Sequence, residues 1–230
     1  MLSWYNSCTN TVDYVQGLVK ALAHVFPDSP HRFCLMHIYS NFKNAGFSGE
    51  ELRKLIFRAS YSYTKAGFDE AMEEIKRDCE LAYNWLMQIP TIAWARHAFD
   101  SICKTDLTVN NFSEVFNKMI LDVRSKPIQT MIKGIIDKLM VKYSGTREKV
   151  ERIRWEITPF YAEILEKAKK YSRTCTPKNA ALGLWQVGTS GTGVHAVDLI
   201  AKTCGCRFWD LTGIPCNHAI SVIIKLQQYP

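Results

Sequence analysis

The sequence predicts an α+β fold, in which a long and mostly helical region precedes a small C-terminal domain that contains strands. Three observations predict it. Apolar residues recur at i, i+3, i+4 and i+7 through the first part of the chain, Gly, Thr and Val become frequent after Arg173, and three of the eight cysteines crowd together near the C-terminus. With 47% apolar and 12% aromatic residues, the chain can bury a core, which excludes a wholly disordered protein.

Hydropathy and the N-terminal residues limit where the chain can reside. No stretch approaches the roughly eighteen uninterrupted apolar residues of a membrane span, so no membrane partner is expected. Residues 1–8 lack a basic leader before an apolar run, so we expect no secretory signal. Cysteines in a chain without such a signal indicate a reducing compartment, where metal binding is more common than disulfide formation.

The first 123 residues are predicted to be helical with few strand signals. Ser48 and Glu51 form a capping box that opens a helix ending at Ala59. Apolar spacing predicts further helices over 12–26, 37–46, 67–87 and 93–100, and a short strand over 31–35.

The middle of the chain is basic. Residues 124–173 hold 13 basic and 6 acidic residues, a net charge of +7 that equals the net charge of the whole chain. Helices are predicted over 127–157, which could break at Ser144 and Gly145, and over 159–171 after an N-cap at Thr158. Such a block suits a polyanion such as DNA. The alternative is a solvated face without a partner, because acidic residues are interleaved with the basic ones.

The C-terminal part carries a metal-ligand pattern: Cys204, Cys206, Cys216 and His218 are spaced C-x-C, nine residues, then C-x-H. Zinc in structural sites takes four nitrogen or sulfur ligands in a tetrahedron. Gly205 is expected to let the chain turn tightly around the ion. The pattern therefore predicts one closed, structural Zn²⁺ site. The alternative is three buried cysteines and a chance histidine, since buried free cysteines are common.

Two strands over 187–189 and 194–199, joined by a turn rich in Gly and Thr, precede these ligands, and a helix over 219–226 follows them. The predicted result is a small ββα-like domain. Trp209, inside its loop, is a candidate contact residue for a partner. His24, His31, His97 and His195 stand alone in the sequence and are interpreted as core or surface residues.

The ligand spacing after a Gly-rich hairpin resembles the SWIM zinc finger. A long helical stretch before it, and Cys34-x-x-His37 earlier still, make the ordered set similar to Mutator-like element (MULE) transposases and host proteins derived from them. Cys34 and His37 could bind a metal, but a packed pair is the simpler interpretation. The resemblance implies a partial RNase H-like core with a helical insertion over 1–123, a basic helical block over 124–178, and a SWIM finger over 179–230. It also implies a nuclear location and DNA as a partner.

Transposases of this family hold two Mg²⁺ ions with three carboxylates. By resemblance, Asp13, which precedes Gly17-Leu18, matches the second carboxylate, and Glu114, in Asn110-Asn111-x-x-Glu114, matches the third. Both residues also have simpler interpretations. Asp13 can cap the helix that follows it, and Asn111 with Glu114 can form a capping box.

No acidic residue precedes Asp13, so the first carboxylate of the triad is missing from the sequence. The resemblance therefore implies a zinc-binding C-terminal portion of a transposase, which binds DNA or a protein and is not catalytically competent alone. Mg²⁺ is expected only in an intact parent enzyme. The alternatives are a domesticated transcriptional regulator and, if upstream sequence is restored, part of an active recombinase.

Overall fold

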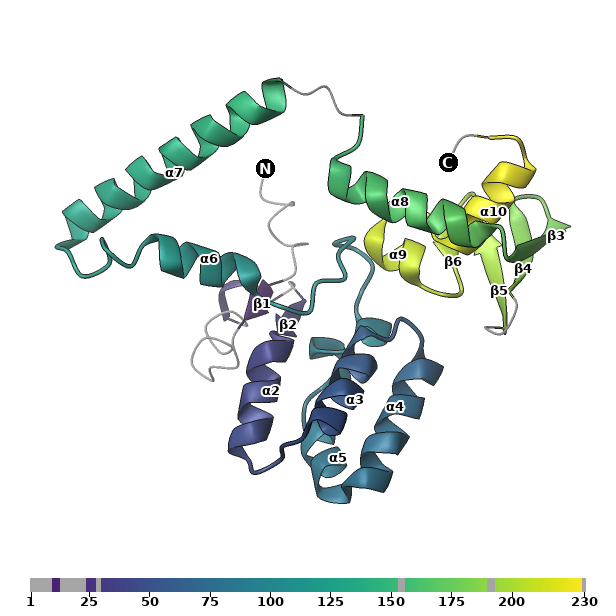
Figure 1. Cartoon of the computed structure of the whole chain (residues 1–230), viewed down its shortest axis with the longest axis horizontal. Helices are drawn as coiled ribbons and strands as arrows, with labels where there is room; N and C mark the ends of the chain where they lie inside the picture. Colours follow the sequence, from purple (N-terminus) through teal and green to yellow (C-terminus); the bar gives the residue numbers. More distant parts are fainter. Residues whose placement is uncertain (1–9, 13–23, 28–29, 153–155, 190–192, 229–230) are drawn as a thin grey trace. The chain divides into compact units, whose positions relative to one another are not determined.

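The computed structural model describes residues 10–12, 24–27, 30–152, 156–189 and 193–228 of the chain (Figure 1). It contains helices and a small antiparallel sheet, which confirms the α+β class. The chain divides into two compact units, one of Met1–Val109 with Ile164–Pro230 and one of Asn110–Glu163. Within the described residues, no helix has both the length and the apolar character needed to cross a bilayer.

Four helices build the larger core of the first unit: α2 (Leu35–Asn44), α3 (Glu50–Tyr61), α4 (Lys65–Asp78) and α5 (Glu80–Met87). Before them, the short strands β1 (Asn10–Val12) and β2 (His31–Phe33) pair in parallel. Most of the predicted helix over 12–26 lies outside the described residues, and so does Asp13.

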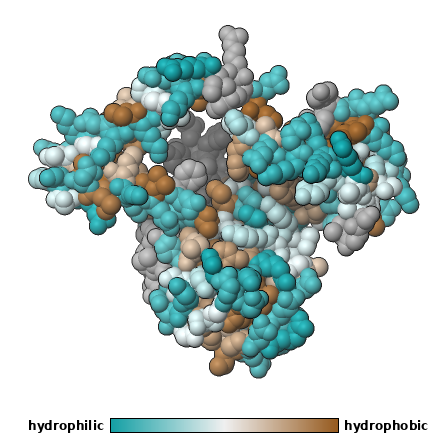
Figure 2. Space-filling view, in the orientation of Figure 1, coloured by the Kyte–Doolittle hydropathy of each residue, from teal (hydrophilic) through white to brown (hydrophobic). Residues whose placement is uncertain are grey.

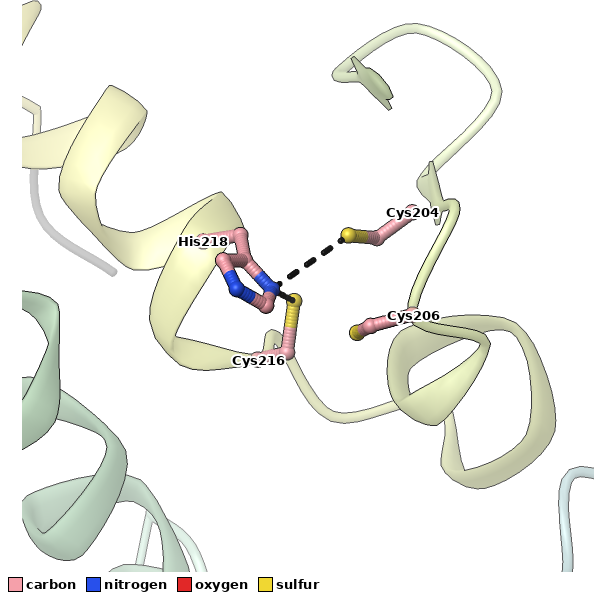
Figure 3. A group of neighbouring side chains, drawn as sticks. All are labelled: Cys204, Cys206, Cys216 and His218. Carbon is pink, nitrogen blue, oxygen red and sulfur yellow. Dashed lines mark hydrogen bonds between the residues drawn. The ribbon is translucent and has the colours of Figure 1, made fainter. Parts of the chain in front are cut away.

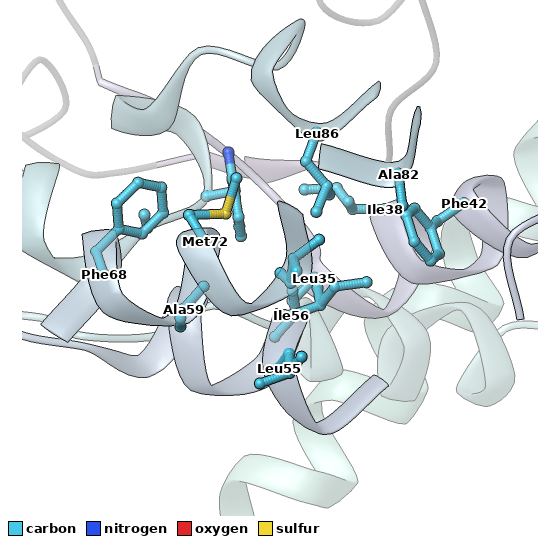
Figure 4. Packing of buried hydrophobic residues seen from close by; sticks show 14 of the residues in the cluster. Leu35, Ile38, Phe42, Leu55, Ile56, Ala59, Phe68, Met72, Ala82 and Leu86 are labelled. Carbon is cyan, nitrogen blue, oxygen red and sulfur yellow. The ribbon is translucent and has the colours of Figure 1, made fainter. Parts of the chain in front are cut away.

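Apolar side chains at helical spacing meet between these helices (Figure 4). Ile38 and Phe42 of α2, Ile56 of α3 and Leu86 of α5 are all buried. Removing side chains of this size from water stabilises the fold by about 1.5–3 kcal/mol each. The helical core therefore has its own source of stability, apart from the C-terminal domain.

Several predicted helix boundaries in this region are wrong. The predicted helix over 67–87 is two helices, because Cys79 is extended (φ −158°, ψ 100°) and interrupts the ladder. The predicted helix over 93–100 is replaced by the short 3₁₀ turns η1 (Thr91–Ala93) and η2 (Arg96–Ala98). Ser48 does not cap α3, since Gly49 occupies the N-cap position and Ser48 lies one residue too far upstream.

The second unit contains α6 (Asn111–Met119) and α7 (Ile128–Glu151). The carbonyl of Asn110 accepts the first helical hydrogen bond of α6, from the Glu114 N–H at 3.3 Å. Asn110 is therefore the N-cap, and the predicted capping box between Asn111 and Glu114 is wrong by one residue. The helix α7 continues through Ser144 and Gly145, because both keep their backbone N–H and Gly costs a helix only about 1 kcal/mol.

The C-terminal domain follows α8 (Pro159–Ser172). Its antiparallel sheet consists of β3 (Cys175–Ala181), β4 (Leu184–Thr189), β5 (Gly193–Asp198) and β6 (Thr203–Cys204), paired in that order. The helices α9 (Phe208–Thr212) and α10 (Asn217–Lys225) complete it. The strands predicted at 187–189 and 194–199 are present as β4 and β5, while the turn between them includes residues outside the described part.

The predicted ββα-like domain is smaller than the observed domain, because the prediction omits the strands β3 and β6. The strand β3 contains Pro177, which lacks a backbone donor, but β3 is the edge of the sheet and tolerates it. A second hydrophobic core lies under this sheet, with Trp185, Val197 and Val222 among its buried residues. Trp209 belongs to the same core and is only 6% exposed, so its predicted role as a contact residue is wrong.

Candidate metal centre

Four side chains from two separate segments converge in the C-terminal domain (Figure 3). Cys204 ends β6 and Cys206 follows two residues later, whereas Cys216 precedes α10 and His218 lies in its first turn. Their ligand atoms all lie within 4.8 Å of one another. Cys204, Cys216 and His218 are buried, and Cys206 is half-buried. The convergence predicted from the spacing is thus present.

The distances between the ligand atoms fit a tetrahedral zinc ion. The Nδ1 atom of His218 lies 3.7 Å from the Cys204 sulfur and 3.8 Å from the Cys216 sulfur. A sulfur and a nitrogen bound to one tetrahedral Zn²⁺ are about 3.6 Å apart. Three sulfurs and one imidazole nitrogen supply all four ligand positions, which is the donor set of a closed, structural site.

Backbone hydrogen bonds fix the first pair of ligands. The Cys204 N–H donates to the Asp210 carboxylate at 2.8 Å, and the Gly205 N–H donates to the Ala196 carbonyl at 2.8 Å. The turn closes where the Arg207 N–H donates to the Cys204 carbonyl at 2.7 Å. These bonds tie the turn that carries Cys204 and Cys206 to β5 and α9.

The left-handed residue in this turn is Arg207 (φ 64°), so the role predicted for Gly205 is wrong. A Cβ atom added at Gly205 would meet the Ala196 nitrogen at 3.5 Å, an ordinary contact. A left-handed conformation costs a residue other than Gly about 1–2 kcal/mol. Two hydrogen bonds from the Arg207 guanidinium offset this cost, to the His97 carbonyl at 2.6 Å and to the Phe99 carbonyl at 2.7 Å.

The second pair of ligands begins α10. Cys216 is the N-cap, and its sulfur accepts a hydrogen bond from the Ala219 N–H at 3.5 Å. This bond satisfies one of the N–H groups that the first turn of α10 leaves without an intrahelical acceptor. Asn217, between the two ligands, donates from its amide to the Cys175 sulfur at 3.6 Å, which ties the first turn of α10 to β3.

The three thiols share their protons unequally. Hydrogen bonds from Cys204 and Cys216 lower the pKa of Cys206 far below its ordinary value. The hydrogen bond to Cys206, with the bond to Cys216 and burial, raises the pKa of Cys204. Binding of a divalent cation requires deprotonated cysteines, so zinc at this cluster would displace the thiol protons.

One histidine that was interpreted as isolated lies beside the centre. The ring of His195, on β5, packs against the ring of His218 with centroids 4.4 Å apart. Burial, together with His218, lowers the pKa of His195 and favours its neutral form. The sequence offered no signal for this contact, because the two residues meet only when β5 lies beside α10.

The other predicted site residues do not join this cluster. Asp13 lies outside the described residues, and Glu114 is exposed on α6 of the second unit. Cys34 is fully buried at the start of α2, where its carbonyl accepts hydrogen bonds from the N–H groups of His37 and Ile38 at 3.0 Å. A ligand atom of Cys34 and one of His37 lie within 4.8 Å of each other, so both interpretations of that pair, packing and metal binding, stay predictions. The catalytic roles of Asp13 and Glu114 stay predictions.

Comparison with known proteins identifies one region of the chain. Residues 187–227 match the family model of the SWIM zinc finger. The match runs from β4 through α10 and includes all four ligands of the centre. No curated protein and no solved structure matches the chain.

Proposed function

With a SWIM zinc finger that fits structural Zn²⁺ as the premise, we propose that this chain is the zinc-stapled part of a Mutator-like transposase or of a host protein derived from one. In this proposal it binds DNA and does not cleave it alone. The observation that carries the proposal is the convergence of Cys204, Cys206, Cys216 and His218, close in sequence to a helical block of net charge +7.

The zinc ion has a structural role in this proposal. Bound Zn²⁺ would supply folding free energy by joining the β6 end to the start of α10. The domain has a modest core of its own, so a metal staple contributes a large share of its stability. No ligand position remains for a substrate, since four protein atoms fill the tetrahedron.

The basic helices supply the affinity for DNA. On α7, Lys133, Lys142 and Lys149 are exposed. Some basic residues there are neutralised locally, as Lys138 is by Asp122 at 3.1 Å and Arg147 by Glu151 at 2.7 Å. The exposed cations that remain suit contacts with phosphates, which position a protein on DNA without reading its sequence.

A protein partner is the second candidate, and one observation favours it. None of the described residues of α7 is buried, and Ile132, Ile136 and Met140 of this helix are exposed. Apolar residues on a surface helix favour contact with another protein. A transcriptional regulator and a part of an active recombinase that binds Mg²⁺ through Asp13 and Glu114 stay predictions, as does the nuclear location.

The test measures DNA binding by the full zinc-loaded chain with fluorescence anisotropy, on a labelled duplex at several salt concentrations. We expect a dissociation constant of about 10⁻⁴–10⁻⁶ M or tighter near physiological salt, weakening steeply as salt rises. Replacing Lys133, Lys142 and Lys149 by Ser should weaken binding and flatten the salt dependence. No binding even at low salt would contradict DNA as the partner and favour a protein. Cleavage of the DNA with Mg²⁺ by the full chain would contradict the catalytic part of the proposal.

A further inference from the structure

A basic groove lies between the end of α8 and the end of α10. Its volume is about 880 Å³. Glu166, Lys169, Lys170 and Arg173 line it from the α8 side, and Gln227 and Gln228 line it from the α10 side. All of these residues lie in the first compact unit, and Figure 2 shows hydrophilic residues gathered over α8.

The charges in this groove are only partly balanced. Lys169 pairs with Glu166 at 3.0 Å, so these two residues neutralise each other. Among the described residues, no carboxylate pairs with Lys170 or Arg173. Lys225 of α10 does not line the groove, and its ammonium donates to the Pro177 carbonyl at 2.8 Å. The groove therefore has two uncompensated positive charges.

The dipole of α8 explains part of this arrangement but not all of it. Cations in the last turn of a helix are stabilised by about 0.3–1 kcal/mol, which accounts for Lys169 and Lys170. Arg173 lies beyond the end of α8, and the exposed amides of Gln227 and Gln228 gain nothing from the dipole. Two cations and two amides around one groove form a site for an anion that also accepts hydrogen bonds.

We propose that this groove binds the phosphodiester backbone of a nucleic acid strand. Lys170 and Arg173 both line the groove, so their side chains can reach neighbouring phosphates of one strand. The amides of Gln227 and Gln228 bond phosphate and sugar oxygens. The inference rests on the proposed function and names the surface of the finger-containing unit that carries it.

The metal centre fixes one wall of the groove. Cys216 caps α10 and His218 lies in its first turn, so the ion would anchor the helix whose other end leads to Gln227. The α8 wall joins the same domain directly, since β3 begins three residues after α8 ends. Binding in the groove should therefore require zinc as well as the two cations.

The test compares two variants of the full zinc-loaded chain on labelled oligothymidylate. The first, Lys170→Ser with Arg173→Ser, removes the groove cations. The matched control, Lys76→Ser with Arg77→Ser, removes the same charge from the last turn of α4, where both side chains are also exposed. Zinc content and circular dichroism should be unchanged in both variants, because none of the four side chains is buried.

We expect the groove variant to bind about tenfold more weakly than the parent at about 100 mM salt, with a salt slope lower by about 1.4 for two lost phosphate contacts. The control should keep nearly the parent affinity. Equal losses in the two variants, or no loss in the groove variant, would overturn the groove while leaving DNA binding intact. Failure of the parent to bind any nucleic acid at low salt would overturn both proposals. Equally tight, groove-dependent binding of poly-glutamate would also overturn the assignment to phosphodiesters.

Discussion

The imidazole ring of His195 lies against the ring of the zinc ligand His218, with centroids 4.4 Å apart and planes tilted by 44°. His195 extends from β5 and His218 from α10, so the contact joins the sheet to the helix that the metal anchors. Because packing already restricts the His218 ring, the side chain loses less conformational entropy when it binds the ion. We therefore expect His195 to position the His218 ring.

Replacing His195 by Ala should weaken zinc binding, because the His218 ring loses its neighbour. We expect a loss of about tenfold, as for other contacts that orient a zinc ligand. His195→Phe is the matched control, since it keeps a ring at the same place and should retain most of the affinity. Competition with a chromophoric chelator measures both values. An Ala variant that binds zinc as tightly as the parent would show that the contact is incidental.

Arg207 offers a test of backbone strain. Arg207→Ala removes the hydrogen bonds to the His97 and Phe99 carbonyls and keeps a side chain in the left-handed conformation (φ 64°). We expect a loss of about 2–4 kcal/mol in the free energy of unfolding. Arg207→Gly loses the same bonds but relieves the strain, so it should be about 1 kcal/mol less destabilising. Urea unfolding followed by tryptophan fluorescence measures the difference. A Gly variant that is less stable than the Ala variant would contradict the role of the conformation.

The helical core can be tested on a single helix. Leu86 of α5 is fully buried and Leu81 of the same helix is 72% exposed. Leu86→Ala should lower the free energy of unfolding by about 2–5 kcal/mol, because it leaves a cavity. Leu81→Ala should change it by less than about 0.5 kcal/mol. Equal effects would contradict the packing shown in Figure 4, and both variants should keep their zinc, since the two cores are separate.

Tyr63 should make stability fall at alkaline pH. Burial, with the hydrogen bond from its hydroxyl to the Asp106 carboxylate at 2.6 Å, raises the pKa of Tyr63 well above its ordinary value. Above pH of about 10, the unfolded chain releases this proton while the folded chain keeps it, so each further pH unit costs about 1.4 kcal/mol. Tyr63→Phe lacks this contribution. The stability advantage of the parent over this variant should therefore shrink between about pH 10 and 11.5. An advantage that stays constant in chemical denaturation over this range would contradict the raised pKa.

Local sequence patterns predicted the metal ligands and several of the helices, because these features depend on residues that are close in the chain. The C-x-C and C-x-H pairs, each two residues apart, indicated the ligands, and local signals such as proline, caps and apolar spacing predicted α3, α7 and α8. Cys79 shows the limit of this reasoning. Nothing in the periodicity marks it as extended, yet its backbone conformation (φ −158°, ψ 100°) separates α4 from α5.

Contacts between distant segments could not be predicted from spacing. The edge strand β3 was not predicted. It contains Pro177, and proline is unfavourable within a sheet but is tolerated in an edge strand. The position of β3 at the edge is known only from the assembled sheet. His195 meets His218 across 22 intervening residues, and Arg207 bonds carbonyls more than 100 residues earlier in the chain. Contacts between residues that are this far apart in the sequence are identified only from the three-dimensional structure.

The zinc content of the purified full chain tests the metal centre most directly. Elemental analysis should find one zinc per chain in the parent and in Cys79→Ala, a variant of a cysteine outside the cluster. Cys216→Ala should contain almost none, because it removes a ligand and the N-cap of α10. A parent without zinc, or a Cys216→Ala variant that holds as much zinc as the parent, would contradict a site built from these four residues.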